Sequence, residues 1–110
     1  MNKAIRYLWV YSAADEWTVN WHNKLLLKRQ KQGYHIRNFC NTPLTLNRRW
    51  LPFHELDERW KKGDPILMNM YERLAKEIEK ADVFVLYNGA NIHPDFIRQF
   101  NVLKCIKAGA

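Results

Sequence analysis

The sequence predicts an α/β fold in which a parallel sheet is covered by helices on both faces. Val83 to Leu86 is a continuous run of β-branched and aromatic residues, too short for an ordinary helix and typical of a strand buried on both sides. Ala4 to Tyr11 is a second run of this kind, interrupted only by Arg6. Segments with helical spacing lie between such runs, and this alternation is typical of parallel sheets.

The N-terminal half is expected to supply a strand, a helix and a second strand. Ala4 to Tyr11 is predicted as a central strand. Trp17, Trp21 and Leu25 follow at four-residue spacing, which predicts an amphipathic helix. That spacing favours core positions for both tryptophans over a sugar-stacking platform. Tyr34 to Cys40 then alternates apolar and polar residues, which indicates a strand nearer an edge.

The C-terminal half is expected to hold three helices and two strands. Apolar spacing predicts a short helix from Pro52 to Lys62. Asp64 and Pro65 have the N-cap and first-turn pattern that begins a helix. The apolar stripe of this second helix consists of Leu67, Met70, Tyr71, Leu74 and Ile78. The third strand is Val83 to Leu86, His93-Pro94-Asp95 begins a third short helix, and Val102 to Ile106 forms a fourth strand.

This order of elements predicts one Rossmann-like domain over residues 1–110, a three-layer sandwich with about four parallel strands. Strand order 3-2-1-4 is favoured, and 2-1-3-4 is the alternative. In the favoured order Cys40 and Cys105 lie on strands about twice ~4.8 Å apart, beyond the ~7 Å limit for a disulfide. Both are therefore expected to be free thiols. Strand three or four would be an open edge, through which the chain could self-associate.

The composition limits the classes of partner. The net charge of +7 fits nucleic acid, an anionic membrane surface or a phosphorylated ligand. However, the basic residues lie on several elements without a recognised binding motif, so nucleic-acid binding is an alternative that is not favoured. No run is long enough to span a membrane, and the apolar N-terminal run suits a strand better than a secretion signal. Two cysteines outside any metal-ligand spacing favour a reducing, cytoplasmic location.

Candidate functional residues follow the strands, because open α/β sheets bind ligands beyond the carboxyl ends of their strands. His93 is the catalytic candidate, since a neutral histidine at a helix N-terminus beside a cleft can act as a general base. Its alternative role is to cap the helix. Candidate substrate-binding residues are Ser12, Asp15, Asn88, Gly89 and Asn91. Ser12 or Asp15 can instead cap a helix, and the asparagines can be turn residues with positive φ. Asn41 and Thr42 lie at the same edge.

Several known chemistries have no motif in this chain. It contains no G-x-G-x-x-G, no phosphate-binding G-x-x-x-x-G-K-[ST], no H-E-x-x-H and no G-x-S-x-G. The first and third strands end in Tyr11-Ser12 and Tyr87-Asn88, without the aspartates of a phosphoacceptor domain. We therefore expect neither a metal nor a resident cofactor.

Four segments resemble one protein family. They are Leu56–Asp64 (L-D-E-R-W-K-K-G-D), Leu67–Ala75, Ala81–Ile97 and Phe100–Cys105, and I-H-P-D-F-I is the most specific piece. Together they are similar to the N-terminal domain of glycosyltransferases of the spore-maturation (CgeB-like) type. That resemblance implies the two-domain GT-B arrangement and transfer of a sugar from a nucleotide-sugar donor.

The resemblance also implies a division of labour between two domains. The N-terminal domain would shape the acceptor side, with Asn91 and His93 facing the cleft, and a second domain would hold the nucleotide. This chain departs from the family because K-A-G-A stands where an acidic segment usually follows strand four. We therefore expect an acceptor-side fragment or truncated relative that is inactive alone. The alternative is a small non-enzymatic α/β binding or interaction module.

Overall fold

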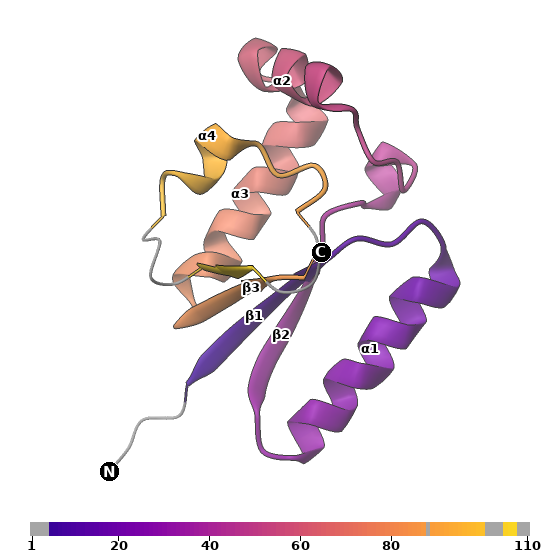
Figure 1. The fold of residues 1–110 in the computed structure, drawn as a ribbon, viewed down its shortest axis with the longest axis vertical. Helices are drawn as coiled ribbons and strands as arrows, with labels where there is room; N and C mark the ends of the chain where they lie inside the picture. Colours follow the sequence, from indigo (N-terminus) through magenta and orange to yellow (C-terminus); the bar gives the residue numbers. More distant parts are fainter. Residues whose placement is uncertain (1–4, 88, 101–104, 108–110) are drawn as a thin grey trace.

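The computed structural model describes residues 5–87, 89–100 and 105–107, the last three by their backbone alone (Figure 1). The elements follow one another as β1 (Arg6–Tyr11), α1 (Glu16–Lys31), β2 (His35–Cys40), the 3-10 turn η1 (Leu44–Leu46), α2 (Phe53–Lys62), α3 (Pro65–Glu79), β3 (Val83–Leu86), α4 (Pro94–Ile97) and β4 (Cys105–Lys107). The α/β class and the sequence of elements are as predicted. Of the predicted fourth strand, residues 102–104 lie outside the described residues.

The strands are parallel, and β1 lies between β2 and β3. The short β4 pairs with β3, so the sheet order is β2-β1-β3-β4. At the start of β1 the backbone N–H of Arg6 donates to Asp82 Oδ2 at 2.9 Å, and its guanidinium pairs with the same carboxylate at 3.1 Å. These contacts fix the register at which β3 enters the sheet.

The favoured strand order 3-2-1-4 is wrong, and the alternative 2-1-3-4 is the one observed. The reason lies in the side chains of β2, where His35 and Arg37 are exposed. A strand with such residues is stable at an edge but not between two neighbours, where both faces would be covered. The predicted position of this strand near an edge is confirmed. β3 is consequently an inner strand, and of the two strands expected at an open edge, three or four, it is β4 that ends the sheet.

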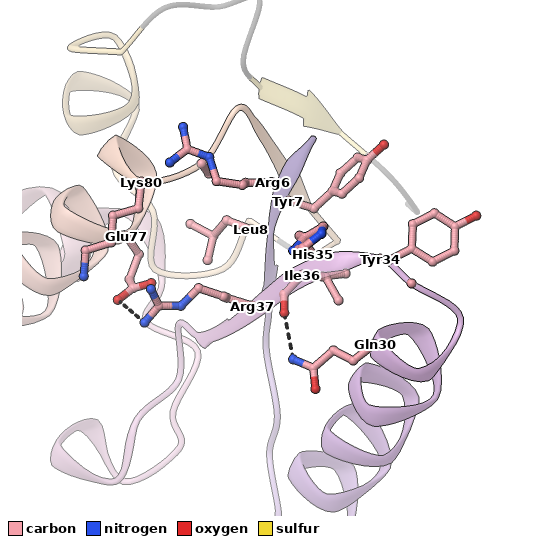
Figure 2. Close-up of a pocket in the computed structure, with 12 residues that line it drawn as sticks. Arg6, Tyr7, Leu8, Gln30, Tyr34, His35, Ile36, Arg37, Glu77 and Lys80 are labelled. Atoms are coloured by element: carbon pink, nitrogen blue, oxygen red, sulfur yellow. Dashed lines mark hydrogen bonds and ion pairs between the residues drawn. The ribbon is translucent and has the colours of Figure 1, made fainter. Parts of the chain in front are cut away.

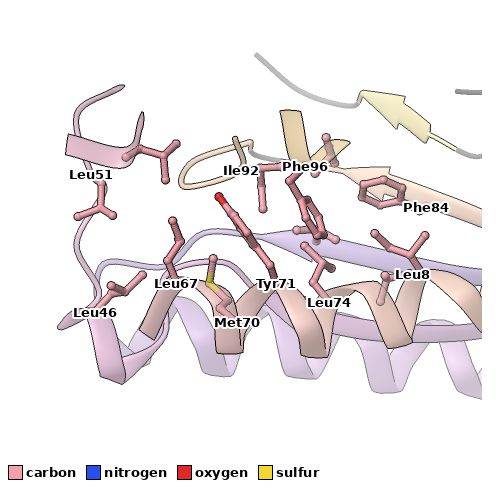
Figure 3. Close-up of a cluster of buried hydrophobic side chains, with 14 of the residues drawn as sticks. Leu8, Leu46, Leu51, Leu67, Met70, Tyr71, Leu74, Phe84, Ile92 and Phe96 are labelled. Atoms are coloured by element: carbon pink, nitrogen blue, oxygen red, sulfur yellow. The ribbon is translucent and has the colours of Figure 1, made fainter. Parts of the chain in front are cut away.

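The main core lies between the sheet and α3 (Figure 3). Leu8 and Phe84 point from the sheet toward α3, whose predicted apolar stripe is fully buried: Leu67, Met70, Tyr71, Leu74 and Ile78 are each at most 3% exposed. Ile92 and Phe96 close the same cluster from the β3–α4 loop and α4. Burial of this stripe orients α3 and so places the loops at the carboxyl edge of the sheet.

The opposite face of the sheet is covered by α1, but not in the way that the sequence suggested. Trp17 and Trp21 are 74% and 46% exposed, so their predicted core positions are wrong. The buried residue is His22, whose ring stacks on Tyr11 at 4.1 Å and accepts a hydrogen bond from Trp9 Nε1 at 3.2 Å. Burial lowers the pKa of His22, which favours the neutral ring that this bond requires.

Helix ends follow their local sequence signals. Asp64 caps α3 by accepting from the Leu67 N–H at 3.0 Å, with Pro65 in the first turn, and Gly63 ends α2 with a φ of 65°. Cys40 is a free thiol, as predicted, whereas the side chain of Cys105 lies outside the described residues. Among the helices of the described ranges, none combines the length and the apolar character needed to cross a bilayer.

Candidate functional site at the carboxyl edge of the sheet

Buried polar side chains gather where the strands end. The loops that follow β1, β2 and β3 contribute Ser12, Asn41, Thr42, Asn91 and His93, each at most 8% exposed. Buried polar groups are costly unless they are hydrogen-bonded. The hydrogen bonds of these five residues therefore show which of their polar groups are used within the protein.

Side-chain hydrogen bonds join the loop after β1 to the loop after β2. Thr42 Oγ1 accepts from the Ala13 N–H at 2.7 Å and donates to the Ala13 carbonyl oxygen at 2.7 Å. Beside it, the Ser12 hydroxyl donates to Asn41 Oδ1. Ser12 was predicted to bind substrate, and in this structure its hydroxyl links two loops.

Asn91 connects the third loop to both of its neighbours. Its Nδ2 donates to the carbonyl oxygens of Asn41 and Arg49, each at 2.9 Å, and its Oδ1 accepts from the Leu51 N–H at 2.8 Å. Its φ of 63° lies in the left-handed region, as expected for an asparagine in a turn. The amide is thus fully used inside the protein.

Tyr71 holds the same loop from below. Its hydroxyl donates to the Asn91 carbonyl oxygen and accepts from the His93 N–H at 2.9 Å. Burial raises the pKa of Tyr71 to about 12, so the phenol stays neutral and can make both bonds. The sequence predicts Tyr71 as part of the apolar stripe of α3 but carries no signal for the bonds of its hydroxyl, because both partners are some twenty residues away.

His93 is enclosed, and both of its ring nitrogens are used. Nδ1 accepts from the Asp95 N–H at 3.0 Å, which caps α4, and Nε2 lies 2.8 Å from Asp57 Oδ1. Since Nδ1 accepts, the neutral ring carries its proton on Nε2 and donates it to Asp57. This bond from His93 is the first cause that lowers the pKa of Asp57, followed by the bond from Lys61.

Aromatic rings close over the histidine. Trp60 stacks on His93 with ring centres 5.0 Å apart, and Phe53 stacks at 5.8 Å. The ring therefore fastens α2 to α4 and holds the edge. His93 therefore caps α4, which is the alternative role expected for it. A catalytic role of His93 stays a prediction.

Of the remaining predicted residues, the two that the structure describes take no part in this network. Asp15 is exposed and caps α1, accepting from the Thr18 N–H at 2.8 Å, and this bond lowers its pKa. Gly89 is exposed beside the network, while Asn88 lies outside the described residues. The structure thus brings Ser12, Asn91 and the predicted catalytic histidine into one network, whereas Asp15, in the same loop as Ser12, serves as the N-cap of α1.

The rim above this network is apolar and exposed. Leu44 begins η1, Trp50 stands between the two residues whose backbones bond to Asn91, and Phe53 covers His93. These three side chains are 68%, 55% and 61% exposed. We call them the apolar rim. The rim leaves apolar side chains exposed to solvent, whereas the polar groups of the network are hydrogen-bonded within the protein.

Among the described residues, a hollow of about 370 Å³ is lined by Cys40, Leu44 and Arg48, and two larger hollows lie elsewhere. One of about 680 Å³ is at the amino end of the strands, where Arg37 pairs with Glu77 at 3.0 Å and Gln30 bonds to the Ile36 carbonyl (Figure 2). Its two arginines are engaged in ion pairs, and Lys80 also lines it. The other, about 420 Å³, lies between α1 and the sheet. Within the described part of the chain, no group of three His, Cys, Asp or Glu side chains could hold a metal.

Comparisons with protein-family models, with curated proteins and with solved structures give no match for this chain. The resemblance carried by the segments from Leu56 to Cys105 therefore stays a prediction.

Proposed function

We propose that this chain is a Rossmann-like binding domain, the acceptor-side half of a two-domain glycosyltransferase, and that it does not turn over a nucleotide-sugar alone. The observation that carries the proposal is the contrast at the carboxyl edge. Asn91, Thr42 and His93 are fixed by internal bonds, while the apolar rim above them is exposed. A fixed edge with an exposed apolar rim suits one wall of a site that another body completes.

The fold supports this proposal in two ways. Ligands of open α/β sheets bind at the carboxyl edge, which is where the rim lies. The order β2-β1-β3, with α1 and α3 on opposite faces, fits the doubly wound class to which GT-B domains belong. The resemblance of Ala81–Ile97 and its neighbouring segments implies the chemistry of that other body, a domain that binds the nucleotide-sugar.

Binding and turnover can be tested on the same sample. The chain is incubated with a panel of nucleotide-sugars, and release of the nucleotide is followed. We expect none, and release that depends on the chain would overturn the proposal. In parallel, backbone and indole NMR signals are followed as neutral oligosaccharide acceptors are added.

The expected NMR result is a shift confined to the carboxyl edge, above all at Trp50, Phe53 and Gly89. Substituting Phe53→Ala should abolish the shift, whereas Ile66→Ala, an exposed apolar residue of α3 at 42% exposure, is the matched control. Shifts centred on the hollow between α1 and the sheet, or equal loss in both variants, would contradict the assignment of this edge.

A further inference from the structure

The outer face of α1 carries a continuous line of exposed side chains. Trp17, Trp21, Lys24, Lys28 and Lys31 all belong to this helix and are all exposed. At 100° per residue these five positions fall within about 80° of one another, and they extend over about 21 Å of helix. We call this line the Trp–Lys stripe. Two aromatic rings occupy its first half and three ammonium groups its second half.

Other elements of the fold leave this face open. α1 packs on the sheet through His22, and Leu25 and Leu26 line the hollow on that side. Figure 1 shows α1 at one side of the molecule, away from α2, α3 and α4. A tryptophan with 74% of its surface exposed contributes little to the core, so packing does not explain Trp17.

The charge of the stripe is not neutralised. Most arginines and lysines elsewhere are in ion pairs, but Lys24, Lys28 and Lys31 have no acidic partner among the described residues. The only acidic residue of α1, Glu16, pairs with Arg48 at 2.8 Å. The helix dipole favours cations in the last turn, which accounts for Lys28 and Lys31. It does not account for Lys24 or for the exposed tryptophans.

We propose that the Trp–Lys stripe binds single-stranded nucleic acid. Unstacked bases lie on the faces of Trp17 and Trp21, and the adjoining phosphates bind Lys24, Lys28 and Lys31. Aromatic platforms beside a row of cations are the arrangement that single strands require, because every base has a stacking face and every nucleotide a negative charge. Bases of a duplex are already stacked, so the indole rings select for single strands.

An anionic bilayer fits the stripe less well. A helix that lies on a membrane inserts an apolar face opposite its cationic face. In α1 the apolar face is occupied by the sheet, and the aromatic and basic residues share one line. We therefore expect weaker binding to anionic vesicles than to single-stranded nucleic acid, and the test includes both.

The test measures binding of the full chain to a fluorescein-labelled oligothymidylate of about 15 nucleotides over a series of salt concentrations. Trp17→Ala and Trp21→Ala should each weaken binding about tenfold. Leu27→Ala, which removes an exposed apolar side chain of α1 outside the stripe, is the matched control and should not. Circular dichroism confirms that each variant is folded, a check that Trp21→Ala needs most because the Trp21 ring also packs edge-on against His22.

The lysines are tested through salt. Each phosphate contact to a single strand contributes about 0.7 to the slope of log affinity against log salt. The triple variant Lys24→Gln, Lys28→Gln, Lys31→Gln removes three such contacts and should therefore reduce the magnitude of this slope by about 2. Lys62→Gln, Lys76→Gln, Lys80→Gln removes the same charge from α2 and the end of α3, and should leave most of the slope in place.

Several results would overturn the proposal. They are absence of oligothymidylate binding at low salt, equal weakening by both triple variants, and unchanged binding in the two tryptophan variants. The affinity for the oligothymidylate is also compared with the affinities for heparin and for duplex DNA of the same length as the oligothymidylate. Equal affinity for all three would show a general polyanion surface without base stacking. Preference for phosphatidylserine vesicles over oligothymidylate would assign the stripe to a membrane instead.

Discussion

Asn91 meets two structural demands at once. Its backbone occupies the left-handed region with a φ of 63°, and its amide makes bonds to Asn41, Arg49 and Leu51. The positive φ could be predicted, because asparagine tolerates this conformation better than most residues. The bonds could not, since their partners are forty to fifty residues away and only the assembled loops bring them together.

Substitutions at Asn91 should separate these two demands. Asn91→Gly keeps the backbone conformation but removes the three hydrogen bonds of the Asn91 amide, and should lower the free energy of unfolding by about 2–4 kcal/mol. Asn91→Ala should cost about 1 kcal/mol more, because alanine disfavours the left-handed region. Urea unfolding followed by fluorescence measures both values. Equal stability of the two variants would show that backbone strain is not part of the cost.

His22 gives the fold a predictable dependence on pH. The protonated ring cannot accept the bond from Trp9 Nε1, and burial lowers the pKa of His22 in the folded state. Between its folded and unfolded pKa values the unfolded chain binds more protons, so stability falls as pH drops below the unfolded value of about 6.5.

The contribution of His22 can be isolated by comparing urea midpoints at about pH 7.5 and about pH 5.5. His22→Phe keeps an aromatic ring against Tyr11 but cannot be protonated, so the fall in midpoint should be smaller in this variant than in the unmodified chain. His54→Phe, on the exposed side of α2, is the matched control and should retain the full fall. The same pH dependence in the His22 variant would contradict this account.

At the scale of elements, α1 shows what a sequence pattern leaves undecided. Its existence was predictable, but its rotation about its axis was not. Trp17 and Trp21 have the spacing of a buried stripe, yet the stripe that contains His22, Leu25 and Leu26 faces the sheet. Histidine is a polar residue, so the sequence does not predict that His22 is buried. Its burial is favourable because Trp9 on β1 donates a hydrogen bond to its ring. The stripe of α3 has no such competitor, and its prediction is confirmed.

Substitutions can distinguish an N-cap role of Asp15 in α1 from a substrate-binding role. If Asp15 serves as the N-cap of α1, Asp15→Ala should lower the thermal midpoint by several degrees, and Asp15→Ser should restore most of it, because serine also accepts from the Thr18 N–H. A substrate-binding carboxylate would behave differently. In that case both variants would lose ligand shifts at the carboxyl edge while keeping the midpoint of the unmodified chain.

At the scale of the whole molecule, the class of fold could be predicted while the strand order could not. Orders 3-2-1-4 and 2-1-3-4 contain the same elements with the same connections, so periodicity does not separate them. The exposed side chains of His35 and Arg37 make β2 an edge, and this observation could have been weighed from the sequence. The polar network at the carboxyl edge depends on that order, because β1 brings the loops of its two neighbours together.

The edge formed by β2 leads to a prediction about self-association. The Asn41 N–H donates to the Tyr11 carbonyl at 2.8 Å, so by alternation Ile36, Asn38 and Cys40 turn their backbone groups outward. Such groups can template pairing with a second chain. Here Gln30 Nε2 donates to the Ile36 carbonyl at 3.0 Å and covers part of this edge (Figure 2).

Removing that cover should expose the edge. We expect Gln30→Ala to strengthen self-association severalfold, seen as a larger weight-average mass in sedimentation equilibrium at high protein concentration. Gln32→Ala, which shortens another glutamine at the end of α1 without touching β2, should sediment like the unmodified chain. Identical sedimentation of all three proteins would show that the β2 edge does not mediate association. A stronger tendency in Gln32→Ala would instead point to the end of α1 as the contact.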